Sequence, residues 1–210
     1  MHHVSGSAAA LHARPWPSPP VPSVWLLEAD GPALVLGSTQ RLPPVTGADG
    51  IAVVRRHSGG GAVLLQPGNV LWADVVVPVG DRRWTADVGR GFWWLGEAWV
   101  EALEAVGVTG AEWHRGPLVR GRWSRDVCFA GLGPGEVTLG GRKVVGMSAR
   151  RRRDAALVQC AALLRWDPAA VVAALALPPE AEEELEGVAE GLDVPAGALQ
   201  AAFLAALARR

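Results

Sequence analysis

The chain has 210 residues, half of them hydrophobic, and a formal net charge of −1, so it can bury one sizeable core but has no overall basic field for nucleic acid. Its two cysteines are too few for a disulfide scaffold, and no apolar run approaches the roughly 18 residues of a membrane-spanning helix. Because the first residues also lack the pattern of a secretory signal, we predict a cytoplasmic protein that binds neither nucleic acid nor membranes.

Residues 1–22 hold five prolines among alanines, serines and histidines, so we expect an irregular leader with little to bury. From Val24 the sequence changes to short runs of aliphatic and β-branched residues that glycine and proline separate. Such runs predict strands at 24–27, 33–36, 51–54, 62–65 and 70–77.

Apolar residues between Asp87 and Val106 recur at steps of three and four, which predicts a helix that buries one face. Further β-rich runs predict strands at 126–130, 136–139, 143–149 and 156–164. Alanine, leucine and glutamate then dominate, and prolines divide this tail into about three short helices. We therefore predict an α+β domain over 23–166, with a mixed, mainly antiparallel sheet packed with helices, and a small helical extension over 167–210.

Two segments carry candidate chemistry. Arg55 to Val63 place three glycines between predicted strands, where backbone amides can approach an anionic or carbonyl oxygen and two arginines add charge-assisted donors. Gly140 to Gly146 contain Lys143, the one lysine among twenty basic residues, and a compact ammonium can do what a guanidinium fork cannot. The alternatives are a glycine-rich hairpin with exposed charges and a lysine retained by drift.

The order and spacing of these motifs resemble the superfamily of lipoate–protein ligases and octanoyltransferases. The resemblance covers most of residues 24–166 and rests on Leu36-Gly37-x-x-Gln40, Arg55-Arg56-x-Ser58-Gly59-Gly60-Gly61-Ala62-Val63, Gly68-Asn69 and Gly141-Arg142-Lys143-x-x-Gly146. It implies the class II synthetase-like fold of the biotin/lipoate ligase catalytic domain. It also implies transfer of a lipoyl or octanoyl group to a lysine of a lipoyl-domain or H-protein-like acceptor.

The resemblance makes Lys143 a catalytic residue whose ammonium stabilises the charge that develops on the acyl carbonyl and the leaving group. No tightly bound cofactor or metal is expected, because the histidines and cysteines lack metal-binding spacing. The substrate-binding residues that we carry over lie in the glycine loop and the lysine strand: Arg55, Arg56, Ser58, Gly59, Gly60, Gly61, Ala62, Asn69, Gly146, Ser148 and Ala149.

Cys128 bears on the source of the acyl group. ATP-dependent ligases typically have Asn-Asp in this region, whereas Cys128-Phe129, with the cysteine fifteen residues before Lys143, is similar to cysteine-dependent octanoyltransferases. Those enzymes take the acyl group from acyl carrier protein as a thioester, and Cys128 would then be the nucleophile, with Arg125 or Lys143 lowering its thiol pKa. A ligase would instead use lipoate with ATP and Mg²⁺, and Cys128 would be a small buried hydrophobe.

Several positions depart from the family's pattern. Leu65-Gln66 replace His-Asp, Val158-Gln159-Cys160 replace His-Gln-Gly or His-His-Gly, and Asp74 replaces Ser or Thr. These departures leave room for a different acyl substrate, or for a degenerate member that binds a lipoyl or biotinyl group, or a lipoylated partner, without catalysis. We interpret the run of four arginines at 150–153 as a solvated strand end or a contact for an acidic carrier protein.

Overall fold

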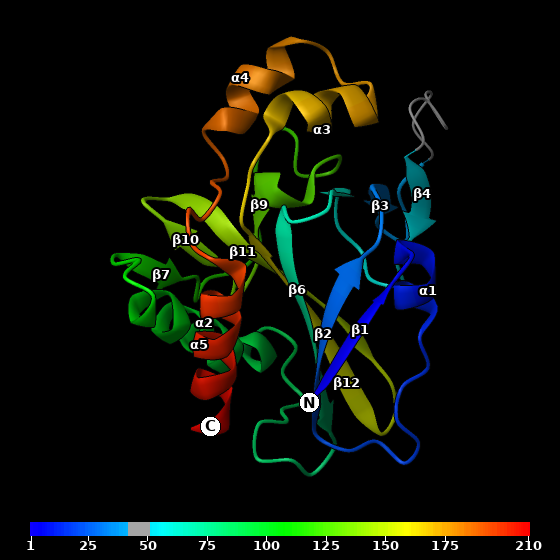
Figure 1. The fold of residues 1–210 in the computed structure, drawn as a ribbon, viewed down its shortest axis with the longest axis vertical. Helices are drawn as coiled ribbons and strands as arrows, with labels where there is room; N and C mark the ends of the chain where they lie inside the picture. Colours follow the sequence, from blue (N-terminus) through cyan, green and yellow to red (C-terminus); the bar gives the residue numbers. More distant parts are fainter. Residues whose placement is uncertain (42–50) are drawn as a thin grey trace.

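The computed structural model describes residues 1–41 and 51–210 (Figure 1). A seven-stranded sheet of order β1-β2-β6-β12-β11-β10-β7 lies at its centre. Every neighbouring pair in this sheet is antiparallel except β1 and β2, so the mixed, mainly antiparallel α+β fold is confirmed. Its strands are β1 (His2–Gly6), β2 (Ser23–Ala29), β6 (Val70–Pro78), β7 (Ala111–Trp113), β10 (Val137–Leu139), β11 (Arg142–Arg151) and β12 (Ala155–Leu163).

Helices α2 (Trp93–Ala105) and α5 (Ala196–Ala208) lie side by side against one face of this sheet (Figure 1). Trp99 of α2 stacks on Phe203 of α5 with ring centroids 3.7 Å apart, and both rings are fully buried. Aliphatic side chains of β6, β11 and β12 complete the core beneath them. The last helix is therefore part of the main hydrophobic core, where aromatic burial contributes most of the packing energy.

A second, three-stranded sheet of order β4-β3-β5 covers part of the opposite face. It consists of β3 (Ala33–Leu36), β4 (Ala52–Arg55) and β5 (Val63–Leu65), and it packs with helix α1 (Ala8–Ala13) on Leu27 and Trp72 of the large sheet. Two short strands, β8 (Val119–Arg120) and β9 (Gly131–Leu132), pair separately. Helices α3 (Pro168–Leu175) and α4 (Glu180–Glu186) pack beyond them, and the described residues contain no helix long and apolar enough to cross a membrane.

Most predicted elements are confirmed, including the strands near 24–36 and 70–77, the helix before Val106 and three helices after residue 167. The leader prediction is wrong for residues 2–13, which form β1 and α1. β1 forms backbone hydrogen bonds to β2, and Ser7 caps α1, which buries Ala8 and Leu11. The sequence did not indicate this order, because it comes in part from backbone pairing with a strand that begins only at Ser23.

The predicted strand at 126–130 is also wrong. Residues Cys128–Ala130 form a single 3-10 turn, and only a bridge between Val127 and Ala62 keeps extended pairing there. The Val127 amide bonds to the Trp123 carbonyl at 2.8 Å, so this backbone closes on itself instead of joining a sheet. The apolar side chains of this turn are buried all the same, which explains why its sequence resembles that of a strand.

Because α5 belongs to the main core, we expect Phe203→Ala to lower the free energy of unfolding by about 3–5 kcal/mol. Leu204→Ala is the matched control, since this neighbouring side chain is only partly buried and should cost less. Urea unfolding of the whole chain measures both values. Equal, small losses for the two variants would show that α5 is dispensable for the core.

Candidate active site

The glycine loop between β4 and β5 is held from within by Arg56. Its buried guanidinium donates to Ser58 Oγ at 3.1 Å and to the carbonyls of Val35 at 3.2 Å, Gly59 at 2.6 Å and Gly61 at 2.8 Å. These bonds engage all three guanidinium nitrogens, so Arg56 shapes the loop more than it offers donors to a ligand. Arg56 nevertheless lines the central cavity described below.

Close backbone contacts explain two of the glycines. A Cβ on Gly61 would lie 2.5 Å from the Val127 carbonyl carbon, and one on Gly37 would lie 1.9 Å from the Gly60 oxygen. Any larger residue would push the loop away from its neighbours. The Cys128 amide donates to the Ala62 carbonyl at 2.9 Å, so the loop and the cysteine lie side by side.

Arg55, in contrast, points away from the cavity. Its guanidinium donates to the carbonyls of Gly37 at 2.9 Å and Gln40 at 2.6 Å, and it holds the turn after β3. Gln40 continues this link by donating to the Asp126 carbonyl at 3.0 Å. Arg55 and Gln40 therefore attach the β3 turn to the segment that carries Cys128.

A bulge in β11 decides where Lys143 points. Val145 pairs with Val137 and Lys143 pairs with Thr138, so Val144 is an extra residue. Val144 and Val145 are both buried in the main core, on the α2 face. Side chains of a strand alternate between the two faces of the sheet, and the extra residue shifts this alternation by one position. Lys143 therefore points to the face opposite α2, where Gly146 and Phe129 lie.

The Lys143 ammonium is buried and fully hydrogen-bonded. It donates to the carbonyls of Cys128 at 3.0 Å and Gly131 at 2.9 Å, and it forms an ion pair of 2.7 Å with Glu136 Oε2. Both side chains of this pair are less than a tenth exposed. Three acceptors match the three donors of an ammonium, and Lys143 therefore lies behind the cavity wall, next to the backbone of Cys128.

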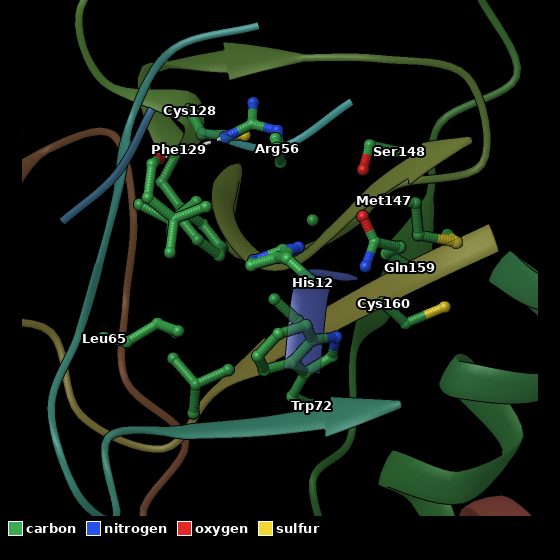
Figure 2. Close-up of a pocket in the computed structure, with 15 residues that line it drawn as sticks. His12, Arg56, Leu65, Trp72, Cys128, Phe129, Met147, Ser148, Gln159 and Cys160 are labelled. Atoms are coloured by element: carbon green, nitrogen blue, oxygen red, sulfur yellow. Dashed lines mark hydrogen bonds between the residues drawn. The ribbon is translucent and has the colours of Figure 1, made fainter. Parts of the chain in front are cut away.

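The central cavity lies between the small sheet and the strands β6, β12 and β11, with empty space of about 500 Å³ that includes its open mouth (Figure 2). Cys128 lies on its wall, whereas the sulfur atoms of Met147 and Cys160 point away from it (Figure 2). Its lining is mainly apolar: Val35, Val63, Leu65, Val70, Trp72 and Ala161.

The imidazole of His12 projects into this cavity from α1 and packs on the Trp72 ring, with centroids 4.6 Å apart (Figure 2). Burial, followed by the charges of Arg56, His57 and Arg14, lowers the pKa of His12 to about 4. The ring is therefore neutral near pH 7. No sequence signal pointed to His12, because the leader was expected to be irregular.

Two of the positions that depart from the family's pattern, Gln159 and Asp74, lie side by side next to this cavity. The register of β11, β12 and β6 sets Ser148, Gln159 and Asp74 in one row across the sheet. Gln159 Nε2 donates to Asp74 Oδ1 at 3.2 Å, and Leu65 lines the same cavity from the small sheet. Burial raises the pKa of Asp74, although the charge of Arg14 opposes the shift.

Of the residues carried over from the resemblance, Arg56, Cys128, Gly146 and Ser148 line the cavity. Ser58 lies just behind this wall and donates to Ser148 Oγ at 3.0 Å, which ties the glycine loop to β11.

The other predicted residues lie farther away. Ala62 packs in a separate cluster with Val127, and Ala149 packs on the α2 face of the sheet. Gly59 and Gly60 supply backbone to the loop without lining the cavity. Asn69 braces the turn before β6 by accepting from the Gln66 amide at 2.9 Å, and it lines a smaller neighbouring pocket.

Glu136 was not predicted from the sequence, yet it organises the lysine. Its Oε1 accepts from the Met147 amide at 2.8 Å and its Oε2 accepts from the Gly133 amide at 2.6 Å, in addition to the bond with Lys143. Nothing in the sequence distinguishes this glutamate from others that precede a strand. Within the described residues no group of three or more histidine, cysteine or acidic side chains could hold a metal ion.

Breaking the buried pair should destabilise the protein. We expect Glu136→Gln to lower the free energy of unfolding by roughly 3–5 kcal/mol, because it leaves the lysine charge uncompensated. Glu190→Gln is the matched control, since its pair with Arg142 is exposed and contributes at most about 1 kcal/mol. Urea unfolding near pH 7 compares them, and similar losses would contradict this account.

The low pKa of His12 predicts a pH-dependent stability. The unfolded chain binds a proton near pH 6.5 that the folded chain binds only near pH 4, so stability falls as pH drops through this window. Between pH 7 and 5 the loss is at most about 2 kcal/mol, and less with solvent screening. We expect His12→Phe to remove this part of the pH dependence in urea unfolding. His114→Phe is the control, and the same change there would refute the assignment.

The fold places the chain among known structures. The bipartite lipoate protein ligase of Thermoplasma acidophilum, studied with its E2 lipoyl domain, shares 17% identity at a TM-score of 0.73, over 99% of this chain and 82% of that one. A lipoate–protein ligase A bound with ATP shares 22% identity at a TM-score of 0.65, over 96% and 76%. A T. acidophilum lipoate protein ligase with bound lipoic acid shares 20% identity at 0.68, over 90% and 71%.

These likenesses establish the shared fold, and the predicted lipoate ligase type of catalytic domain is confirmed. Comparison with curated protein sequences gives no match. The family described as the lipoyl protein ligase A/B catalytic domain matches residues 9–202, which include β11, the glycine loop and most of the helical tail. With nearly the whole chain matched and the cavity in place between the two sheets, this protein belongs to the lipoyl protein ligase A/B catalytic domain family.

Proposed function

We propose that this protein attaches a lipoyl or octanoyl group to a lysine of a lipoyl-domain or H-protein-like acceptor. The observation that carries the proposal is the apolar cavity with the Cys128 thiol on its wall and the Lys143 ammonium directly behind it. Related structures support the substrates, since one holds lipoic acid and another was studied with its E2 lipoyl domain. An acyl chain suits a cavity whose lining is mainly apolar.

The position of Cys128 favours a thioester donor such as octanoyl-acyl carrier protein. In the first step, the Cys128 thiolate attacks the acyl carbonyl, a new carbon–sulfur bond forms, and the donor thiol leaves with the proton that Cys128 released. In the second step, the acceptor amine attacks the acyl-cysteine, an amide forms, and the sulfur of Cys128 leaves and takes the proton of the amine. Atoms and charge balance without a further reactant.

Lys143 would act on the oxygen that becomes negative in both steps. Its ammonium already binds the carbonyl of Cys128 at 3.0 Å, so exchanging this one bond for the acyl oxygen would bring it to the reacting centre. A positioned donor in a water-poor site stabilises such an oxygen strongly. Glu136 and the Gly131 carbonyl would hold the ammonium during that exchange.

Two alternatives have specific support. An ATP-dependent ligase is supported by the related structure with bound ATP and by the smaller pocket on the other side of Phe129, where Asn69, Arg165 and Asp167 supply polar groups for a co-substrate such as ATP with Mg²⁺. A binder without catalysis is supported by Leu65, which lines the cavity at a position where the family's pattern has histidine. It would hold a lipoyl or biotinyl group, or a lipoylated partner.

Intact-mass spectrometry of a lipoyl domain incubated with this protein distinguishes these cases. We expect the mass of an octanoyl group to be added from octanoyl-acyl carrier protein, and Cys128→Ala to abolish the addition. Transfer that needs lipoate, ATP and Mg²⁺ and survives Cys128→Ala would identify a ligase. No mass gain with either donor would refute catalysis.

Three further variants test the roles of Cys128 and Lys143. Cys160→Ala should retain transfer, because this thiol points away from the cavity and burial raises its pKa to about 12. Lys143→Arg should lower the transfer rate at least about 100-fold, since a guanidinium fork cannot reproduce the three ammonium bonds. Arg142→Lys, at the exposed neighbouring position, is its control. Full activity of Lys143→Arg would contradict the assigned role.

A further inference from the structure

A second, smaller cavity adjoins the first beyond His12. Its empty space of about 320 Å³ includes the open solvent at its mouth, and His12 and Gln159 line both cavities. Unlike the apolar first cavity, it is bordered by Arg14, Arg150 and Asp74. The transferase or ligase chemistry proposed above makes no use of these groups.

Arg14 is the reason to expect a ligand there. Its side chain is only 13% exposed, and its one hydrogen bond within the described residues joins Nη2 to Asp74 Oδ2 at 3.2 Å. The Nε and Nη1 nitrogens of Arg14 are buried and have no hydrogen-bond partner in the part of the chain that the structure describes. Its guanidinium lies 4.2 Å above the Trp25 ring, which fixes its plane. Buried donors of a charged group are costly to leave without acceptors.

Asp74 does not satisfy these donors, because only Nη2 of Arg14 lies within hydrogen-bond distance of its carboxylate. Oδ1 accepts from Trp72 Nε1 at 2.8 Å and from Gln159 Nε2 at 3.2 Å, while Oδ2 accepts from Arg14. Arg150 adds a second positive charge to the cavity and forms no ion pair within the described residues. Two guanidinium groups against one carboxylate leave a surplus of positive charge, which favours an anionic ligand.

The second cavity lies at the far end of the acyl path. Gly146, Ser148 and Arg150 follow one another on the same face of β11, and two residues of a strand span about 6.6 Å. Lys143 lies at the Gly146 end of this row, where its side chain passes next to that glycine. A chain that starts beside Cys128 and passes Ser148 and Gln159 therefore ends near Arg14 and Arg150.

We propose that this second cavity binds a carboxylate at the far end of the acyl group, so that the protein prefers a medium-chain dicarboxylic acyl group, attached to its carrier through one end, to the octanoyl group of the same length. The inference rests on the proposed function, because it assumes that an acyl chain occupies the first cavity. Gln159 and His12 lie at the junction between the two cavities, and a neutral His12 does not add to the charge there.

Isothermal titration calorimetry with two amides tests this inference. N-methyloctanamide imitates the transferred acyl group, and the mono-N-methylamide of octanedioic acid adds only the distal carboxylate. We expect the carboxylate-bearing amide to bind at least tenfold more tightly. Arg14→Met should remove this advantage while leaving the affinity for the neutral amide unchanged, and Arg150→Met should reduce the advantage several-fold.

Arg152→Met is the matched control, since this exposed arginine lies over the Trp16 ring at 4.3 Å but lines neither cavity. This variant should still bind the carboxylate-bearing amide more tightly than the neutral one. Equal affinities of the two amides for the unmodified protein would overturn the inference, as would an advantage that survives both Arg14→Met and Arg150→Met. If Arg14→Met weakens the binding of both amides by the same factor, the role of Arg14 is structural. In that case Arg150→Met decides the question, and the inference is overturned if this variant still binds the carboxylate-bearing amide as preferentially as the unmodified protein does. If the protein transfers octanoyl groups to a lipoyl domain but binds the two amides equally tightly, only this inference is rejected. If it binds neither amide, the proposed function is rejected as well.

Discussion

The buried ion pair between Lys143 and Glu136 connects the sheet to the candidate active site. Through the two ends of this pair, the turn that carries Cys128, strand β9 and strand β11 share hydrogen bonds to a single pair of charges. Removing two charges from water costs several kilocalories per mole, which can exceed the attraction between them. A buried ion pair therefore does not by itself indicate a gain in stability. What its geometry does is to hold one ammonium beside the backbone of Cys128. The bulge at Val144 serves the same end, because a regular strand would direct Lys143 into the core.

The cavity itself results from the way two sheets face each other. The small sheet and the glycine loop come close to the turn at Val127 only because no side chain stands at Gly61. Arg56 then satisfies the carbonyls that such a tight loop would leave without partners. This arrangement uses the arginine for internal structure and leaves the cavity wall apolar, and it differs from a phosphate-binding loop, in which free amides and charges face the ligand.

The N-terminal segment closes the cavity at the end opposite Lys143. β1 and α1 bring His12 onto Trp72 and set Arg14 between Asp74 and the Trp25 ring. Two positions that depart from the family's sequence pattern therefore contact each other, since Gln159 bonds to Asp74, and Asp74 in turn accepts from Arg14. Because these two side chains contact each other across the sheet, they are more simply understood as one linked change than as two separate losses.

The sequence by itself determined the main strands, helix α2, the helical tail and the family, since local periodicity and the glycine and lysine motifs are properties of neighbouring residues. It also indicated that Cys128 and Lys143 belong together. Only the tertiary structure decided that residues 2–6 form a strand, because that order depends on backbone pairing with β2, and that residues 128–130 form a turn. It likewise decided that Arg55 faces away and that Lys143 lies behind the wall, since the acceptors that hold these side chains come from segments distant in sequence.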